Sequence, residues 1–193
     1  MVINSKLTWT DHIKTICSKL SKSIGIIYRI RHKLSAHSLL MLYRSLIQPY
    51  CDYCNIVWGT GHSSSLETLF RKQKRAIRVI NYAKWNSHTS PLFRRFKVLS
   101  IFDTNKFQTS CFVYKSMNGL LPISLNNLFH TNYDVHEHDT RQASKIHVVH
   151  HRLKVREYSI TIYGTKIWNS LDKYITDSPS FNMYSRSAAK HTF

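Results

Sequence analysis

The sequence has few glycines, few acidic residues and no long hydrophobic run. Five glycines in 193 residues argue against glycine-rich phosphate loops and dinucleotide-binding sites. No stretch approaches the roughly 20 apolar residues that span a membrane, and the N-terminus lacks the apolar core of a secretory signal. We therefore expect an intracellular protein, in the nucleus or the cytoplasm, that is neither secreted nor bound to a membrane.

The low acidic content leaves a large positive charge. Ten Asp and Glu stand against 28 Lys and Arg, which gives a formal net charge of +18. Residues 1–100 hold 17 basic and 3 acidic residues, whereas residues 101–193 hold 11 and 7. Such an excess usually meets nucleic acid. We predict RNA, DNA or a hybrid as the partner, bound mainly by the first half; a basic membrane-surface protein is the less favoured alternative.

Apolar residues recur every three or four positions over most of the chain, which is typical of amphipathic helices. The patterns cover residues 11–33, 39–47, 66–80, 92–99 and 103–118, with weaker candidates at 166–174 and 180–190. We predict a mainly α fold, with an antiparallel, thumb-like helical bundle over residues 1–100 and a helical or irregular region over residues 101–193. At most one short strand pair is expected, with Ser159–Tyr163 as the candidate strand.

Several local details follow from the same patterns. Thr10 or Asp11 can cap the first helix, Ser35 the second and a serine among residues 63–65 the third, where Glu67 would complete a capping box. Gly119 stands where a glycine commonly ends a helix. The aromatic residues expected in the core are Trp9, Tyr43, Tyr50, Trp58 and Trp168, and helix 103–118 is expected to turn Phe107, Cys111, Tyr114 and Met117 inward.

Basic residues dominate the third helix and the segment that follows it. From Phe70 to Lys97 there are nine basic residues and no acid. Like charges at helical spacing cost about 0.2–0.5 kcal/mol each, so the pattern suits a helix that binds a polyanion. We predict phosphate contacts from Arg71, Lys72, Lys74, Arg75 and Arg78, supported by Lys14, Lys19, Lys22, Arg29, Arg31, Arg94, Arg95 and Lys97. The interleaved aromatics Tyr28, Phe70, Phe93 and Phe96 either stack on bases or belong to the core.

Two groups of side chains could bind a metal. Cys51 and Cys54 are spaced as in zinc sites, but Cys17 and Cys111 offer no second pair, and His62 lacks a partner histidine. We favour free core cysteines in a reducing compartment. A histidine-rich segment, in which Asp134 and Asp139 also lie, contains His130, His136, His138, His147, His150 and His151. It fits structural or phosphate contacts better than a metal site, and no cofactor is expected.

The sequence offers no convincing catalytic arrangement. Its carboxylates are scattered except for Asp134, Glu137 and Asp139, whereas two-metal phosphoryl transfer needs converging carboxylates. The segment Tyr50–Tyr53 is superficially similar to a polymerase Tyr-x-Asp-Asp box, but Tyr53 replaces the second Asp. The pattern therefore indicates a binding module rather than a complete enzyme, and no catalytic residue is predicted.

Taken in order, a series of short motifs resembles the region that follows the catalytic palm in reverse transcriptases of non-LTR (LINE-type) retrotransposons. The motifs are Leu7-Thr8-Trp9-x-x-His12-Ile13, Leu42-Tyr43-x-Ser45-Leu46-Ile47-x-Pro49-Tyr50-x-x-Tyr53-Cys54, Val57-Trp58-Gly59, Leu66-x-x-Leu69-x-x-x-Gln73-Lys74-Arg75-Ala76-Ile77-Arg78, Pro91-Leu92-Phe93, Asn118-Gly119-Leu120-Leu121-Pro122, His136-x-His138-x-Thr140-Arg141 and Gly164-x-x-x-Trp168-Asn169-x-Leu171. The resemblance extends from about residue 5 to residue 185.

The resemblance implies a helical thumb over roughly residues 10–100, which packs against primer–template duplex in that family. It also implies that the fingers, the palm with its catalytic aspartates and the endonuclease are missing, so we expect a truncated remnant that binds nucleic-acid backbone without sequence preference and does not polymerise DNA alone. Other parts of a reverse transcriptase are further expected partners. Two alternatives stay open: a free-standing DNA-binding regulator with residues 65–80 as its recognition helix, and a non-functional pseudogene product.

Overall fold

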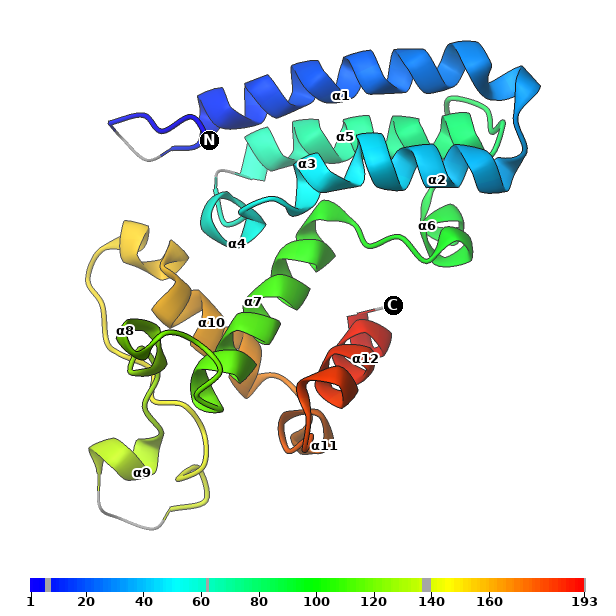
Figure 1. Cartoon of the computed structure of the whole chain (residues 1–193). Helices are drawn as coiled ribbons and strands as arrows, with labels where there is room; N and C mark the ends of the chain where they lie inside the picture. The colour runs from blue at the N-terminus through cyan, green and yellow to red at the C-terminus, as the bar shows by residue number, and fades with distance from the viewer. Residues whose placement is uncertain (6–7, 62, 137–139, 193) are drawn as a thin grey trace. The chain divides into compact units, whose positions relative to one another are not determined.

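The computed structural model describes residues 1–5, 8–61, 63–136 and 140–192, and these residues are mainly helical (Figure 1). This confirms the predicted mainly α class. The chain divides into two compact units, residues 1–105 and residues 106–192, which are described in turn. Leu7, His62, Glu137, His138 and Asp139, all named above, lie outside the described residues.

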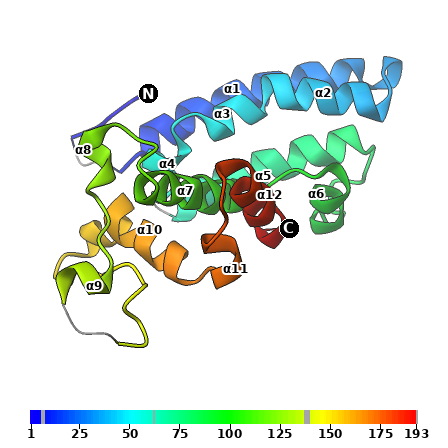
Figure 2. The same cartoon turned by 60° about the horizontal axis from the view of Figure 1, so that its bottom comes forward.

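The first unit contains three long helices that pack together. Its elements are α1 (Thr10–Ile30), the 3-10 turn η1 (Arg31–Lys33), α2 (Ala36–Leu46), α3 (Gln48–Asp52), α4 (Asn55–Trp58), α5 (Ser63–Ile80), α6 (Ser90–Phe96) and the first turn of α7 (Ile101–Met117). Helix α2 runs back along α1 and is antiparallel to it, and α5 lies beside α1 in both views (Figures 1 and 2). Helices α1 and α5 run in the same direction, because Trp9 meets Gly61 at one end and Arg31 meets Tyr82 at the other.

The core of this unit follows the apolar spacing of its helices. Ile13, Leu20 and Ile27 of α1 are buried against Leu69 and Ile77 of α5 in one hydrophobic cluster. Burial of each such side chain is worth about 1.5–3 kcal/mol. Tyr43 and Trp58 are fully buried, as expected. Tyr50 is not a core residue, because it is 37% exposed in the short helix α3, where Cys51 is the buried residue.

The helix ends confirm one predicted cap and correct another. The Ser35 hydroxyl accepts a hydrogen bond from the backbone N–H of Ser38 and so caps α2. Neither Thr10 nor Asp11 caps α1; Trp9 holds that position in a left-handed backbone conformation (φ 59°), with no side-chain cap. Residues 63–65 lie inside α5. Helix α6 ends at Phe96, three residues earlier than expected, because Lys97 adopts φ 49°.

The second unit packs around an aromatic cluster. It holds the rest of α7, followed by α8 (Ile123–Asn126), α9 (Asn132–Val135), the 3-10 turn η2 (Lys154–Tyr158), α10 (Ile160–Asn169), α11 (Lys173–Thr176) and α12 (Phe181–Thr192). The rings of Tyr114 and Tyr184 stack with their centroids 4.3 Å apart, and Trp168 stacks on Tyr184 at 5.8 Å. Met117 is 36% exposed and does not face inward, because it lies in the last turn of α7.

Gly119 ends α7 as predicted. Its φ is +67°, the N–H of Leu120 donates to the Lys115 carbonyl at 2.8 Å, and the N–H of Gly119 donates to the Ser116 carbonyl at 3.2 Å. These two bonds are the pair that defines a Schellman motif.

The predicted strand over Ser159–Tyr163 is wrong. Ser159 precedes α10, and Ile162, Thr165 and Trp168 are buried at helical spacing along it. The alternation that suggested a strand covers only five residues, and the 3.6-residue period that continues beyond it determines the structure. The pairing found within the described ranges is one isolated antiparallel bridge, between Thr131 and Ile146. The expected helix over 166–174 is likewise split, since α10 ends at Asn169 and α11 begins at Lys173.

Candidate nucleic-acid interface

Basic side chains form a stripe along the solvent-facing side of α5. Arg71, Arg75 and Arg78 follow at intervals of four and three residues, opposite the buried face that contains Leu69, Gln73 and Ile80. Arg71 and Arg75 are exposed and make no hydrogen bond, ion pair or ring contact with another described residue. Their guanidinium groups are therefore available for an external anion.

Two other bases of α5 already have protein partners. Lys74 Nζ lies 3.7 Å from a Glu67 carboxylate oxygen and 4.0 Å from the centre of the Phe70 ring. Arg78 Nε donates a hydrogen bond to the Ser87 carbonyl at 2.9 Å. An exposed ion pair is worth about 0–1 kcal/mol, so Lys74 could exchange Glu67 for a phosphate, whereas Arg78 also holds the segment that follows α5.

The bases of α1 lie on more than one side of the bundle. Lys22 and Arg29 are exposed on the side of α1 that is opposite its buried face. Lys14 forms an ion pair with Asp11, with its Nζ 3.6 Å from a carboxylate oxygen. Lys72 of α5 lies near Cys17 of α1, and its positive charge partly offsets the effect of burial, which raises the pKa of that thiol. The thirteen predicted bases therefore do not share one face.

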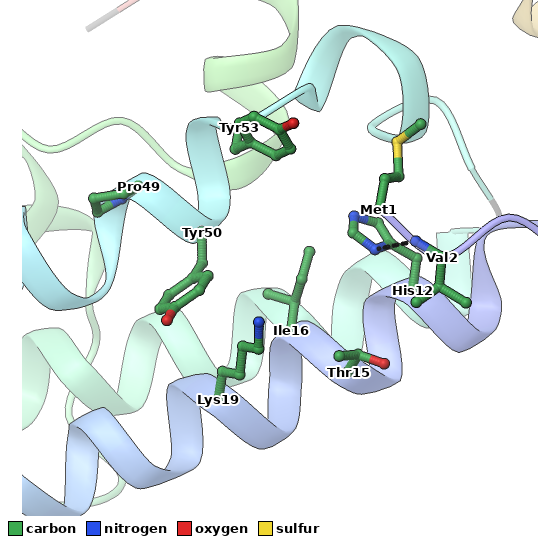
Figure 3. A pocket seen from close by; sticks show the side chains of 9 residues that line it. All are labelled: Met1, Val2, His12, Thr15, Ile16, Lys19, Pro49, Tyr50 and Tyr53. Atoms are coloured by element: carbon green, nitrogen blue, oxygen red, sulfur yellow. Dashed lines mark hydrogen bonds between the residues drawn. The ribbon is translucent and has the colours of Figure 1, made fainter.

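Lys19 lies at a pocket between the first turns of α1 and helix α3 (Figure 3). The pocket has a volume of about 390 Å³, and Lys19 Nζ is 5.3 Å from the centre of the Tyr50 ring. His12 forms part of its wall; the backbone N–H of Val2 donates to His12 Nδ1 at 3.3 Å. Burial, followed by the positive charges of the chain's amino group and Lys19, lowers the pKa of His12. The pocket thus combines the Lys19 ammonium group with aromatic and aliphatic walls.

Aromatic residues beside the bases divide into two groups. Phe93 and Phe96 are buried and Phe70 packs against Phe93 and Phe102, so these rings belong to the core rather than to a stacking surface. Tyr28 is half exposed beneath the Arg31 guanidinium. Arg94, Arg95 and Lys97 are exposed around α6.

Tyr82 and Trp85 are exposed as well, and the sequence analysis did not single them out. Both lie between α5 and α6, in a segment where no helical pattern requires an aromatic residue. Their position outside every apolar stripe is the signal that would have identified them.

The cysteine and histidine candidates do not assemble into a metal site in the part of the chain that is described. All four cysteines are free, and Cys51 is buried in α3 while Cys54 precedes α4. The rings of His136 and His147 lie 5.7 Å apart, but the Asp134 carboxylate accepts hydrogen bonds from the backbone and hydroxyl of Thr131. These bonds lower the pKa of Asp134 and complete the capping box of α9.

These features define a class of module, namely a helical unit with a large excess of positive charge. Over 106 residues the chain is 24% identical to a protein of Drosophila melanogaster described as a probable RNA-directed DNA polymerase from transposon X-element. The aligned part makes up 53% of this chain and 12% of that polymerase, so the chain matches a small fraction of its length. This similarity supports a distant relationship to non-LTR retrotransposon reverse transcriptases.

No model of a protein family matches the chain, and no solved structure matches it. Among the described residues, none of the helices has the length and apolar character needed to cross a membrane.

Proposed function

We propose that residues 1–105 form a thumb-like module that binds the phosphate backbone of nucleic acid without sequence preference. We further propose that the chain derives from a non-LTR reverse transcriptase. The observation that carries the proposal is the stripe of α5, where Arg71 and Arg75 are exposed and have no partner among the described residues. Lys72, at the edge next to α1, is the third base of α5 that no described hydrogen bond or ion pair engages.

The charge around this stripe supports the proposal. No Asp or Glu occurs in residues 12–51 or 68–102. These ranges include all of α2 and α6, nearly all of α1 and most of α5. A solvated helix surface ordinarily mixes both signs, because pairs at i,i+4 stabilise it and like charges destabilise it. Phosphates supply the missing negative charge, and their condensed counterions are released on binding. The relationship to an RNA-directed DNA polymerase is consistent with such a partner.

The test is a salt series with matched charge variants. The variant R71A/K72A/R75A removes three bases without breaking a described hydrogen bond or ion pair. On duplex DNA or an RNA–DNA hybrid, it should bind more weakly and flatten the slope of log K against log salt by about 2–3. The control K145A/R152A/K173A removes the same charge from exposed sites in residues 106–192 and should leave the slope unchanged.

Three results would contradict the proposal. An unchanged affinity and slope in R71A/K72A/R75A would mean that α5 is not the contact surface. An equal loss in both variants would mean that net charge alone governs binding. Strong preference for one duplex sequence would favour base readout by a recognition helix over backbone contact.

A further inference from the structure

One end of the bundle gathers exposed aromatic rings around a guanidinium group. Arg31 Cζ lies 4.3 Å from the centre of the Tyr28 ring and 5.4 Å from that of Tyr82, so both rings flank one cation. The Tyr82 hydroxyl donates a hydrogen bond to the Arg31 carbonyl, and the His32 ring lies 6.0 Å from the Tyr82 ring. Tyr28 and Tyr82 nevertheless stay 51% and 49% exposed. The rings are thus fixed in place without being buried.

Trp85 projects from the same segment that carries Tyr82. It is 87% exposed, whereas Trp58 and Trp168 are buried. Trp85 is held in a turn, because the N–H of Ser87 donates to the Lys84 carbonyl at 3.1 Å and Arg78 Nε donates to the Ser87 carbonyl. Arg95 further holds this segment through a 3.1 Å hydrogen bond to Asn81. A large apolar ring held in water by a hydrogen-bonded turn has no stabilising role in the described fold.

The charge at this end of the bundle indicates what covers the rings. The elements that meet there are the end of α1, η1, the end of α5 and α6. They lie within residues 12–51 and 68–102, where no Asp or Glu occurs. Lys84, Arg94 and Arg95 are exposed there. An apolar protein partner would need to bring many acids to this surface, whereas a nucleic acid supplies both flat rings and negative charge.

We propose that Tyr28, Arg31, Tyr82 and Trp85 form a stacking platform for unpaired bases of single-stranded nucleic acid. This proposal rests on the backbone binding proposed above, to which it adds a contact that duplex DNA cannot make. Stacking of a base on an aromatic side chain is tolerant of sequence and contributes about 1–3 kcal/mol, which corresponds to about 5- to 150-fold in affinity. The Arg31 guanidinium adds a cationic contact at the same point.

The experiment compares two single strands with the same phosphates. One is an oligothymidylate of about 12 nucleotides, and the other has the same length and abasic sites throughout. The oligothymidylate should bind at least about fivefold more tightly and quench the fluorescence of Trp85, while the abasic strand should bind without quenching. W85A should lose the difference between the strands, and W85F should keep most of the affinity but lose the quenching. Y133A removes an exposed ring of the other unit and serves as the control.

Each outcome separates the two proposals. Equal affinity for both strands in the native protein, unchanged in W85A, would overturn the platform and leave backbone binding intact. Failure of both strands to bind at low salt would overturn backbone binding and the platform with it. Loss of affinity for the abasic strand in W85A would show that Trp85 acts on the fold, and this result also contradicts the platform.

Discussion

The side-chain amide of Gln73 donates a hydrogen bond of 2.9 Å to the hydroxyl of Tyr43 inside the first unit. The same amide nitrogen donates to the Leu99 carbonyl at 2.9 Å, and its oxygen accepts from the backbone N–H of Ile101 at 3.0 Å. One polar residue on the buried face of α5 therefore fixes α2 and the start of α7. Burial strongly raises the pKa of Tyr43, so this hydroxyl stays protonated.

Replacing Gln73 with Leu should therefore strongly destabilise the protein, because the substitution removes the hydrogen bonds of three other groups together with the amide. Three partners would lose their hydrogen bond to Gln73, and the bonds to Tyr43 and Ile101 are buried. A buried group left without a hydrogen bond costs about 1–3 kcal/mol. Y43F removes one partner only, because Gln73 keeps Leu99 and Ile101, and should cost about 1 kcal/mol. Urea denaturation measures both. Equal losses in the two variants would show that the network does not hold the unit together.

Gly59 should not tolerate alanine. A Cβ there would collide with the backbone carbonyl of Asn55 and with the side-chain amides of Asn55 and Asn105. Asn105 also donates to the Asn55 carbonyl at 3.0 Å, so the contact between α4 and α7 would open. Gly25 in α1 is the matched control, since its Cβ would meet no atom within 4 Å. G25A should stabilise the helix by about 1 kcal/mol, whereas G59A should lower the melting temperature; a rise in both would contradict this packing.

His12 should make stability depend on pH. Burial, chiefly, lowers its pKa in the folded chain, while the unfolded chain keeps a value near 6.5. The unfolded state therefore binds more protons as the pH falls below about 6.5, and the free energy of unfolding should decrease from about pH 7 to about pH 5. H12L should remove this part of the slope, and H37L, at an exposed site of α2, should keep it. A slope that is identical in all three proteins would exclude His12 as its source.

Cys51 should be protected from alkylation. Burial raises the pKa of its thiol to about 12, and only the thiolate reacts. Relative to an ordinary cysteine of pKa about 8.5, its thiolate is on the order of a thousandfold rarer near neutral pH. Iodoacetamide should modify the half-buried Cys54 first and Cys51 only after unfolding, as read by peptide mass spectrometry. Equal native rates would mean that α3 opens readily.

Much of the fold could be predicted because its long helices bury regular stripes. The spacing of Ile13, Leu20 and Ile27 determines the buried face of α1. Ser35 caps α2 and Gly119 ends α7 through contacts with residues close to them in the sequence, so both could be predicted locally. The left-handed Trp9 and the exposed Tyr50 depend on how distant segments meet, which no local pattern encodes. Ile160 and Ile162 were misleading because five alternating residues fit a strand and a helix almost equally well.

From the sequence, the candidate site could be predicted only as an excess of basic residues, without their arrangement in space. The excess of bases indicates a polyanion. Spacing alone does not show that, among the described residues, Lys74 and Arg78 have partners while Arg71 and Arg75 have none. The two rings around Arg31 could not be predicted either, because the turn after α5 brings Tyr82 to the guanidinium group that Tyr28 also contacts. Those two residues are 54 positions apart in the sequence, so periodicity could not relate them.

The most direct test of the central claim is the salt dependence of binding to an RNA–DNA hybrid, duplex DNA and single strands by the purified, monodisperse chain. Contacts from Arg71, Lys72 and Arg75 alone predict a slope of log K against log salt of about −2 to −3, becoming steeper as Lys74 and the bases of α1 take part. Micromolar binding with such a slope and no sequence preference is the expected result. Absence of binding at low salt, or binding that salt does not weaken, would contradict the account.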